Sequence, residues 1–550
     1  MSTVLITSGA YVGVECVAEF GRLPPAFLPV GNRRLYERQI ELLQTAGPTR
    51  ILLSIPEDFE PDGFDLGRFD ELGVELVRVP ENLGLGESVV FVLNVTAPGD
   101  GALRILHGDT LIEGIAFDET DVVSIGSSDE YYLWAEWHEE AQGQGVPALI
   151  DEFPSDGAPK RHLSGYFSFS SSHLLVQSIT RARGDFIGGL MAYSANRRLR
   201  PLETGAWMDF GHLQTYYQSR TRMTTQRAFN DLQITRRAVT KSSRDTHKMM
   251  AEATWYERLP RGLKAFTPHL LDMSTEGKQV SYRVEYLHHL PLSDLYVFGR
   301  LPKVVWRAVF RALDEWVSAC AEHFPEEPLR EIAATVPLYR EKTLERLERF
   351  EASTGTSLDT PWTFNGRLLP SLREIAETAA AAVPAPDMSD IRVIHGDLCF
   401  SNVLYDFRTH QVKLIDPRAL NGHGEPTIYG DRRYDLAKLH HSVVGLYDFI
   451  IAGQYRLECG PGYRIDFDVS REPRIREIQE EFLATRFGGL SLCEAASLPI
   501  SILFFLSMLP LHADQPRRQM AMMANALRLY CELAQTPDQV QDAAVTLACT

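Results

Sequence analysis

The sequence predicts two domains in tandem, an α/β domain with a mostly parallel sheet and an α+β domain made of two lobes. Three observations lead to this prediction. The chain has 550 residues, which at ~150 residues per domain is too long for one ordinary core. Its first part alternates short β-rich runs with helical runs. Its second part begins with short β-rich runs and has mostly helical periodicity afterwards.

Composition and charge are those of an ordinary soluble globular chain. Hydrophobic residues make up 44% of the sequence and charged residues 23%. The formal net charge is −18 at pH 7, from 55 Lys and Arg against 73 Asp and Glu. Recognition of a nucleic-acid backbone needs clustered Lys and Arg, so we expect no nucleic-acid partner. A small anionic substrate would need only a local basic pocket.

Cysteine usage and hydropathy bear on the compartment. The seven cysteines are irregularly spaced and form no Cys-x-x-Cys pair, which favours a reducing, cytoplasmic compartment over a disulfide framework or a structural zinc site. The opening MSTVLITSGAYVG resembles a first strand running into a glycine loop more than a signal peptide. The most apolar run, 498–511, is shorter than ~18 residues and holds two prolines, so we expect a buried helix and no membrane insertion.

The first domain, over 1–220, is predicted from a series of alternating elements. We expect strands at 4–8, 50–56, 74–80 and 102–109, and helices at 36–47 and 86–96. Strand–helix–strand order implies a Rossmann-like, mostly parallel sheet with helices on its faces. The polar and basic run around 216–226 is predicted to be a linker.

The second domain, over 225–550, is predicted to have an N-lobe over about 225–298 and a C-lobe over about 299–550. The N-lobe should contain a hairpin from RAFNDLQI and RAVTKS, a helix from THKMMAEATWYERL and a strand from VSYRVEYL. In the C-lobe, VIHGD, NVLYD and QVKLID predict a loop and short strands surrounded by helices.

The tripeptide His-Gly-Asp occurs at 107–109 and again at 395–397. In the second copy, Asn402 follows Asp397 at a short spacing, and Asp416 ends the predicted strand VKLID. Phosphoryl transfer needs a carboxylate that orients the attacking hydroxyl and oxygen ligands for Mg²⁺ at the nucleotide phosphates. Asp397 suits the first role, and Asn402 and Asp416 suit the second. The alternative, unrelated polar residues around a β-turn, explains this spacing less well.

This stretch resembles the aminoglycoside phosphotransferase and choline kinase family, whose fold is that of protein kinases. The resemblance implies an ATP-dependent small-molecule kinase in which Lys241 contacts the ATP phosphates and pairs with Glu252. The alternative for this pair is a surface lysine and a solvated helix glutamate. A protein kinase is disfavoured, because Asp416 is followed by Pro-Arg and not by Phe-Gly.

Other parts of the family pattern can be assigned to this sequence. Adenine would contact backbone groups near Glu285 and Leu287. No obvious glycine-rich loop precedes Lys241, so a shorter segment around Asn230–Leu232 is expected to cover the phosphates. The Asp-x-Ala element of the family matches Asp435, whose expected role is to brace the catalytic loop. Structural residues near the site are His395 and Asp435.

Candidate contacts for phosphate or acceptor are less specific. Three arginines are expected either to approach phosphate or to face solvent: Arg418, Arg432 and Arg433. The segment 511–530 supplies, near a helix start, His512, Asp514, Arg517 and Arg518. Its acidic group would suit a cationic alcohol and its arginines an anionic or sugar acceptor, and the sequence does not choose between them.

The first His-Gly-Asp belongs to a different pattern, because position 114 is Gly where the kinase spacing needs Asn. The order LITSGAYVG, LPPAFLPVGNRRLYERQIELL, ENLGLGESVV, HGD, SGYFSFSSSHLL and WMDFGHLQTYYQSR resembles the sugar-phosphate nucleotidyltransferases. The resemblance implies that Asp109 and Asp209 hold Mg²⁺ while a second NTP is bound and a sugar-phosphate oxygen attacks its α-phosphorus.

This first pattern is incomplete in its phosphate-binding cations. The loop GAYVGVECV lacks the family's Arg and carries Glu15, and Pro25 occupies the position of the family's Lys. Arg22 would replace them only if the loop is rearranged, and the base-binding segment reads GLGES. A domain with such losses could bind a sugar, support a homo-oligomer or regulate the kinase.

Together the two patterns predict an ATP-dependent kinase acting on a sugar or amino alcohol, fused to a nucleotidyltransferase-like domain. By resemblance, such an enzyme would supply activated precursors for surface polysaccharide or envelope. Its cofactors would be Mg²⁺ and ATP, with a second NTP in the first domain if that domain is active. The alternatives are a fully bifunctional kinase and nucleotidyltransferase, and a nucleotide- or sugar-sensing scaffold with an inactive first domain.

Overall fold

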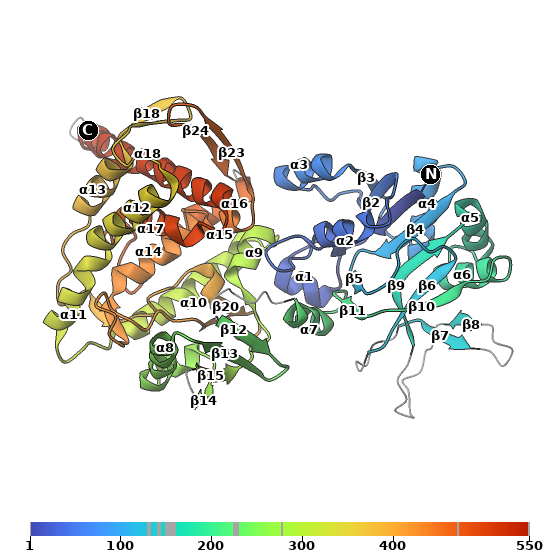
Figure 1. Cartoon of the computed structure of the whole chain (residues 1–550), viewed down its shortest axis with the longest axis horizontal. Helices are drawn as coiled ribbons and strands as arrows, with labels where there is room; N and C mark the ends of the chain where they lie inside the picture. Colours follow the sequence, from blue (N-terminus) through green and yellow to red (C-terminus); the bar gives the residue numbers. More distant parts are fainter. Residues whose placement is uncertain are drawn as a thin grey trace. The chain divides into compact units, whose positions relative to one another are not determined.

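The computed structural model describes residues 2–128, 132, 134–139, 145–148, 161–223, 230–276, 279–469 and 472–547. Its contacts divide the chain into two compact units (Figure 1). The first unit contains Met1–Thr225 together with the short segment Phe298–Leu301. The second contains Gln226–Val297 and Pro302–Thr550.

The first unit is built on a mixed sheet whose main path runs in the order β10-β6-β9-β4-β1-β2-β3. Its strands are β1 (Ser2–Thr7), β2 (Arg50–Pro56), β3 (Val74–Val79), β4 (Ala102–His107), β6 (Val122–Gly126), β7 (Glu136–Glu139), β8 (Gly145–Ala148), β9 (His162–Phe169) and β10 (Arg200–Glu203). The pairs β1–β2, β1–β4, β2–β3 and β6–β10 are parallel, whereas β9 is antiparallel to both of its neighbours on the path. The predicted class of this domain, α/β with a mostly parallel sheet, is confirmed.

Helices and short turns join and cover these strands. They are α1 (Val14–Phe20), η1 (Pro25–Phe27), α2 (Leu35–Gln44), α3 (Gly63–Leu72), α4 (Leu85–Thr96), α5 (Ser172–Arg181), α6 (Phe186–Ser194) and α7 (Leu213–Arg222). The alternating strand and helix pattern forms because each strand buries apolar side chains under a helix. A core of this kind joins Leu52 and Ile105 of the sheet to Val89, Leu175 and Leu190 of α4, α5 and α6.

The predicted linker at 216–226 is wrong over its described part. Residues 216–222 belong to α7, while 224–226 lie outside the described residues. Tyr216 is fully buried, its ring lies 4.9 Å from that of Phe20, and its hydroxyl donates to the Pro29 carbonyl at 2.5 Å. The polar and basic composition of this run hid the tyrosine face that attaches the helix to the unit.

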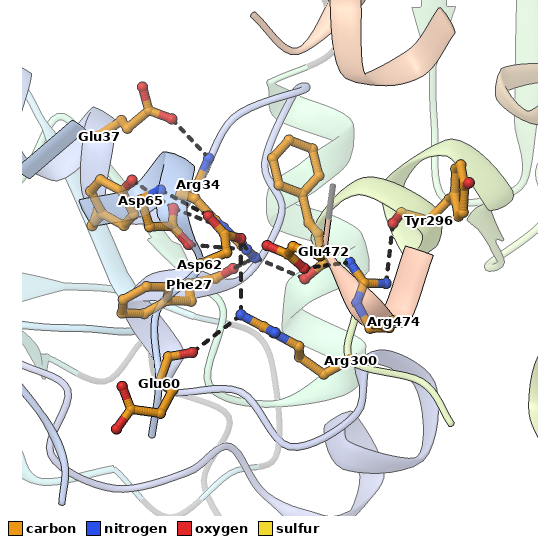
Figure 2. Close-up of polar contacts among 12 residues, drawn as sticks. Phe27, Arg34, Glu37, Glu60, Asp62, Asp65, Tyr296, Arg300, Glu472 and Arg474 are labelled. Atoms are coloured by element: carbon orange, nitrogen blue, oxygen red, sulfur yellow. Dashed lines mark hydrogen bonds and ion pairs between the residues drawn. The ribbon is translucent and has the colours of Figure 1, made fainter. Parts of the chain in front are cut away.

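A buried arginine organises the segment that follows η1 (Figure 2). Arg34 is 1% exposed and pairs with Asp62 and Asp65, each at 3.2 Å. It also donates to the carbonyls of Phe27 at 2.9 Å and Phe298 at 2.8 Å. A guanidinium has five donors and is stable in a core only when they are satisfied. Arg34 thereby holds the loop before α2 against the start of α3.

The N-lobe of the second unit is a four-stranded antiparallel sheet in the order β12-β13-β15-β14. Its elements are β12 (Asn230–Ile234), β13 (Ala238–Ser243), α8 (Thr246–Arg258), η2 (Leu263–Phe266), β14 (Leu270–Glu276) and β15 (Gln279–Glu285). Helix α8 lies beside this sheet (Figure 1) and buries Trp255 and Tyr256. The segment Asn230–Leu232, expected to cover phosphates, lies within β12, and the turn of this hairpin falls later, at 235–237.

The C-lobe is mostly helical. Its helices and turns are α9 (Leu292–Phe298), α10 (Lys303–Ala321), α11 (Pro328–Thr335), η3 (Val336–Leu338), α12 (Arg340–Thr354), α13 (Leu372–Ala381), η4 (Phe400–Asn402), α14 (Arg432–Val443), α15 (Tyr447–Ile451), α16 (Pro473–Ala484), α17 (Ser497–Ser507), η5 (Leu509–His512) and α18 (Pro516–Leu547). Helix α17 is the predicted buried helix, and it packs against α12, α14 and α18. Among the described residues, no helix combines the length and apolar character needed to cross a bilayer.

Three small sheets lie among these helices. They are β16 (Leu290–Pro291) with β20 (Val403–Asp406) and β21 (Gln411–Leu414), then β19 (Ile391–Val393) with β22 (Tyr429–Asp431), and β17 (Trp362–Phe364) with β18 (Arg367–Leu369), β23 (Tyr455–Gly460) and β24 (Arg464–Val469). A small sheet with one helix, followed by a helical lobe, is the predicted two-lobed α+β class, which is confirmed.

Candidate active sites

The hairpin of β20 and β21 brings two of the predicted metal ligands to one end. Its register pairs Val403 with Leu414, and the Ile415 amide donates to the Asn402 carbonyl at 3.0 Å. Asn402 and Asp416 therefore lie at the same end of the hairpin. Asp416 has a φ of 57°, a left-handed conformation that turns the chain sharply after the strand.

Asp397 lies between an amide and a lysine. The Asn402 Nδ2 donates to Asp397 Oδ2 at 3.0 Å, and Lys438 Nζ lies 2.9 Å from Oδ1. Burial by itself would raise the pKa of this carboxyl, but the charge and hydrogen bond of Lys438 lower it to about 2. Asp397 is therefore ionised at neutral pH. Its side chain keeps 38% of its accessible surface, which leaves room for a substrate.

Helix α14 holds the backbone of the His-Gly-Asp loop through Asp435. Asp435 accepts hydrogen bonds from the amides of His395 at 2.7 Å and Gly396 at 2.8 Å. The ring of His395 is bonded through Nε2 to the Ile415 carbonyl at 2.9 Å, and Trp255 Nε1 donates to the Ile394 carbonyl. Burial lowers the pKa of His395 to about 4, so the ring is neutral near pH 7. Asp435 and His395 thus have the structural positions expected for them.

Lys241 joins the N-lobe to the Asp416 end of the hairpin. It lies on β13, and its Nζ is 2.6 Å from Glu252 Oε2 on α8 and 3.2 Å from Asp416 Oδ1. Tyr282 donates to the same Glu252 oxygen at 2.7 Å. Burial opposes the charge of Lys241, but the two carboxylates raise its pKa above the usual value. The side chain is 9% exposed, which excludes the alternative of a surface lysine.

Glu285 and Leu287 lie at and just beyond the end of β15, both partly buried. The Glu285 amide donates to the His269 carbonyl at 2.9 Å, and the Tyr286 amide donates to the Arg237 carbonyl at 2.9 Å. These two N–H groups are therefore used inside the sheet. An adenine base at this edge could therefore bond only to backbone groups that follow Tyr286.

The remaining predicted contacts fall into different environments. Arg433 is 4% exposed and bonded to Asp431 at 2.7 Å, so it fits neither of its two alternatives, an approach to phosphate or a solvent-facing position. Arg432 has a buried Nε without a hydrogen-bond partner among the described residues. Asp514 is exposed ahead of α18, and in the described chain no hydrogen bond or ion pair joins it to the His-Gly-Asp loop.

Lys438 was not predicted from the sequence as a residue of the site. It follows Asp435 by one helical turn, and this i, i+3 spacing puts both residues on the α14 face that meets the His-Gly-Asp loop. Three further cations, Lys342, Arg346 and Arg418, lie near Tyr434. Lys342 and Arg346 were also missed, whereas Arg418 is one of the arginines predicted as a contact for phosphate or acceptor. Their signal as a group is tertiary, because Arg418 is distant in the sequence from Lys342 and Arg346, which share α12.

The first unit brings together its two predicted carboxylates. Strand β5 (Thr110–Glu113) pairs with β11 (Ala206–Asp209) so that Thr110 faces Asp209, and Asp109 directly precedes β5. Burial and then the charge of Asp209 raise the pKa of Asp109 to about 6. His212 Nδ1 lies 3.2 Å from Asp209 Oδ2. A side chain at Gly211 would meet Asp109 Oδ2 at 2.5 Å, so the glycine leaves this carboxylate pair room.

Phosphate-binding cations are scarce around this carboxylate pair. Arg22, the expected substitute, pairs with Asp58 and Glu81, each at 2.7 Å, and lies 3.9 Å from the Tyr11 ring centroid. Pro25 begins η1. In the sequence, Lys160 is the one lysine before residue 226, and it lies outside the described residues. Arg22 is therefore neutralised by Asp58 and Glu81.

Comparisons with known proteins identify structures of both predicted kinds. No family model and no curated protein matches the chain. Similar solved structures include HddC from Yersinia pseudotuberculosis, at 15% identity over 41% of this chain and 100% of that one, with a TM-score of 0.30. The inositol-1-phosphate CTP transferase from T. maritima shares 13% over 40% and 96%, with a TM-score of 0.30.

A thermostable mutant of aminoglycoside phosphotransferase APH(4)-Ia shares 11% identity over 56% of this chain and 93% of its own, with a TM-score of 0.33. Both enzyme types that the sequence resembles are thus represented. Similarity at these TM-scores does not indicate the function of this chain. The function has to be inferred from the side chains of the two sites.

Proposed function

We propose that the second unit is an ATP-dependent kinase that phosphorylates a hydroxyl group of a small molecule. The observation that carries this proposal is the convergence of Lys241, Glu252 and Asp416, from both lobes, beside the Asp397–Asn402 pair. Such a set supplies a cation that can bind the phosphates, oxygen donors for a metal, and a carboxylate that can orient the hydroxyl. Structural ion pairs alone do not account for the accessible Asp397 carboxylate.

The donor set suits Mg²⁺ shared with a nucleotide. Mg²⁺ is usually bound through one or two carboxylates, substrate phosphates and water. The Asp416 carboxylate and the Asn402 amide oxygen are such donors, and among the described residues no group of three or more His, Cys, Asp or Glu forms an all-protein metal site. Bound there, Mg²⁺ would neutralise charge on the phosphates.

In the proposed reaction the acceptor hydroxyl lies against Asp397 and its oxygen attacks the γ-phosphorus of ATP. A bond forms between that oxygen and phosphorus, and the bond from phosphorus to the β–γ bridging oxygen breaks, its electron pair leaving with ADP. The hydroxyl proton passes to Asp397. Because the pKa of Asp397 is about 2, it is a weak base that chiefly orients the hydroxyl. Lys438 holds the carboxylate in place.

Two measurements on the full chain test this proposal. ADP release is measured with ATP and Mg²⁺ against a panel of sugars and amino alcohols, and at least one is expected to stimulate it. Calorimetry measures ATP binding with Mg²⁺, which Asp416→Ala should abolish. As a control, Asp466→Asn, on β24 and paired with Arg464, should bind ATP like the native chain. Equal Mg²⁺-dependent binding by Asp416→Ala would remove the metal assignment.

For the first unit, the Asp109–Asp209 pair supports a site for a cation and an NTP. The neutralised Arg22 favours binding without transfer, as in a sensing or scaffold domain. The fully bifunctional alternative requires pyrophosphate release from CTP, GTP, UTP or dTTP with a phosphorylated acceptor. A kinase product activated in this way would suit the supply of precursors for surface polysaccharide or envelope.

A further inference from the structure

A cluster of cationic side chains surrounds Tyr434 on the side of Asp397. Lys342 and Arg346 lie one turn apart on α12 and so share a face of that helix. Arg418 follows β21, and Lys438 lies on α14. We call the four residues Lys342, Arg346, Arg418 and Lys438 the cation cluster.

Aromatic rings contact two members of the cluster, Arg418 and Lys438. The Arg418 guanidinium carbon lies 5.3 Å from the Tyr434 ring centroid. Tyr434 packs on Phe504, with ring centroids 4.6 Å apart, and Lys438 Nζ is 4.8 Å from the Phe504 centroid. Lys438 also reaches Asp397 at 2.9 Å. The cluster is therefore continuous with the carboxylate that would receive the acceptor hydroxyl.

Within the described part of the chain, few carboxylates offset the charges of this cluster. Among the described residues, Lys438 is the one member that pairs with a carboxylate. Arg346 donates to the Ser507 carbonyl at 3.1 Å, while its acidic neighbour Glu345 is bonded to Arg349. By contrast, the buried Arg433 nearby is matched by Asp431. Four cations thus share one carboxylate in a chain whose net charge is −18.

The neighbouring positive charges shift the pKa values of Lys342 and Tyr434. Tyr434 supports the charge of Lys342, but burial and the positive charges of Arg418, Arg346 and Lys438 lower the pKa of Lys342 to about 8. Burial would raise the pKa of the Tyr434 hydroxyl, yet Lys342, Arg418 and Lys438 lower it to about 8. Like charges held together without a partner are typical of a site built for an anion.

The anion in question is distinct from the ATP phosphates. The charges that act on Lys241 are those of Asp416 and Glu252. The charges that act on Tyr434 are those of Lys342, Arg418 and Lys438 in the cluster and that of Asp397. The two groups of charges are therefore distinct, and the cation cluster is the one that contacts Asp397, through Lys438.

We propose that the acceptor alcohol carries an anionic group of its own, a phosphate or a carboxylate, which the cation cluster binds while the hydroxyl lies against Asp397. This inference rests on the proposed kinase function. The reaction is the one balanced above: the acceptor oxygen gains the γ-phosphoryl group, ADP leaves with the bridging oxygen, and the proton passes to Asp397. The product is a phosphate monoester that keeps its original anionic group.

The first experiment compares matched acceptors on the full chain with ATP and Mg²⁺. Glucose, glucosamine, gluconate and glucose 6-phosphate, with further sets of the same design, differ in the charge they carry. Anionic members should exceed neutral and cationic ones at least ~10-fold in kcat/KM, about 1.4 kcal/mol. Gluconate and glucose 6-phosphate distinguish a carboxylate from a phosphate. Equal or better use of neutral or cationic members would overturn the inference and leave the kinase intact.

The second experiment measures binding of inorganic phosphate by calorimetry to the chain saturated with a non-hydrolysable ATP analogue and Mg²⁺. Lys342→Gln and Arg346→Gln should each weaken phosphate binding ~10-fold without changing affinity for the analogue. Arg349→Gln, on the same helix but exposed and paired with Glu345, should have no effect. A melting temperature of Lys342→Gln that is unchanged or higher separates lost binding from lost folding.

The two experiments distinguish this inference from the kinase proposal. Phosphate binding that Lys342→Gln weakens, with no acceptor turned over, supports the anion site and counts against the kinase. Turnover of neutral acceptors without phosphate binding counts against the anion site alone. Loss of analogue affinity in Lys342→Gln would mean that the cluster serves ATP, and it would also refute the inference.

Discussion

At the scale of single residues, Asp397 combines a fixed geometry with a low pKa. We expect Asp397→Asn to lower kcat for ADP release at least ~10²-fold, the usual loss for such a group. The folded pKa of about 2 lies below the ordinary value of about 4. The carboxylate therefore stabilises the fold above pH ~4, and this contribution is lost as pH falls through 2.

The melting temperature and the ADP assay together check this prediction. Asp397→Asn should melt slightly lower at pH 7, because Lys438 loses its partner beside other cations. Asp466→Asn serves as the control. Native turnover by Asp397→Asn with a confirmed acceptor would remove Asp397 from the mechanism.

The cation cluster predicts a basic limb in the pH profile. Lys342 and the Tyr434 hydroxyl both titrate near pH 8, so raising the pH removes positive charge and adds negative charge. KM for an anionic acceptor should therefore rise above pH ~8, while KM for ATP stays level. The rise should be smaller in Lys342→Gln. A flat acceptor KM up to pH 9 would show that these groups do not contact the acceptor.

The positive charge of Lys342, which should favour binding of an anionic acceptor, should lower the stability of the fold. A lysine whose pKa is lowered on folding destabilises the fold while it is charged, and this effect fades as pH rises from 8 towards its ordinary value of about 10.4. This is why Lys342→Gln should not lower the melting temperature at pH 7.

At the scale of elements, α14 supports the catalytic loop through Asp435. In Asp435→Asn, one oxygen that accepts an amide N–H becomes an NH₂ group, which cannot accept it. We expect a loss of about 1–3 kcal/mol in the free energy of unfolding, measured with urea, and a lower kcat because His395 and Gly396 lose their anchor.

A matched control for this prediction is Asp448→Asn. Asp448 is equally buried, but its Oδ2 has no hydrogen-bond partner among the described residues. Its substitution should therefore destabilise the chain less. Equal losses in the two variants would mean that burial of the side chain, and not the bracing of the loop, determines the effect.

At the scale of the whole molecule, two units carry separate carboxylate sites on separate cores. Because Asp109 belongs to the first unit and Asp397 to the second, Asp109→Ala should leave ADP release within about twofold of native. Any pyrophosphate release or NTP-induced thermal shift should be lost in Asp109→Ala and kept in Asp397→Asn. Loss of ADP release in Asp109→Ala would show coupling between the two sites.

Much of the fold and of the second site was predictable because its signals are local. The βαβ series follows from periodicity, and Asp397, Asn402 and Asp416 lie within one hairpin and its loop. Lys241 and Glu252 required the resemblance, since nothing in RAVTKSS or KMMAEATWYERL by itself distinguishes a buried ion pair from a solvated one. The linker at 216–226 was wrong, because composition cannot reveal that Tyr216 and Tyr217 face a core.

The sequence by itself determined the order of elements, the fold class and the three oxygen-bearing residues of the phosphotransferase pattern. Tertiary structure alone decided that Arg22 is neutralised, that Arg433 is buried against Asp431, and that four cations from three distant segments meet at Tyr434. The physical reason is the sequence range over which each signal acts. Periodicity and motif spacing act within one or two elements, whereas burial and Coulomb interactions depend on which elements the folded chain brings together.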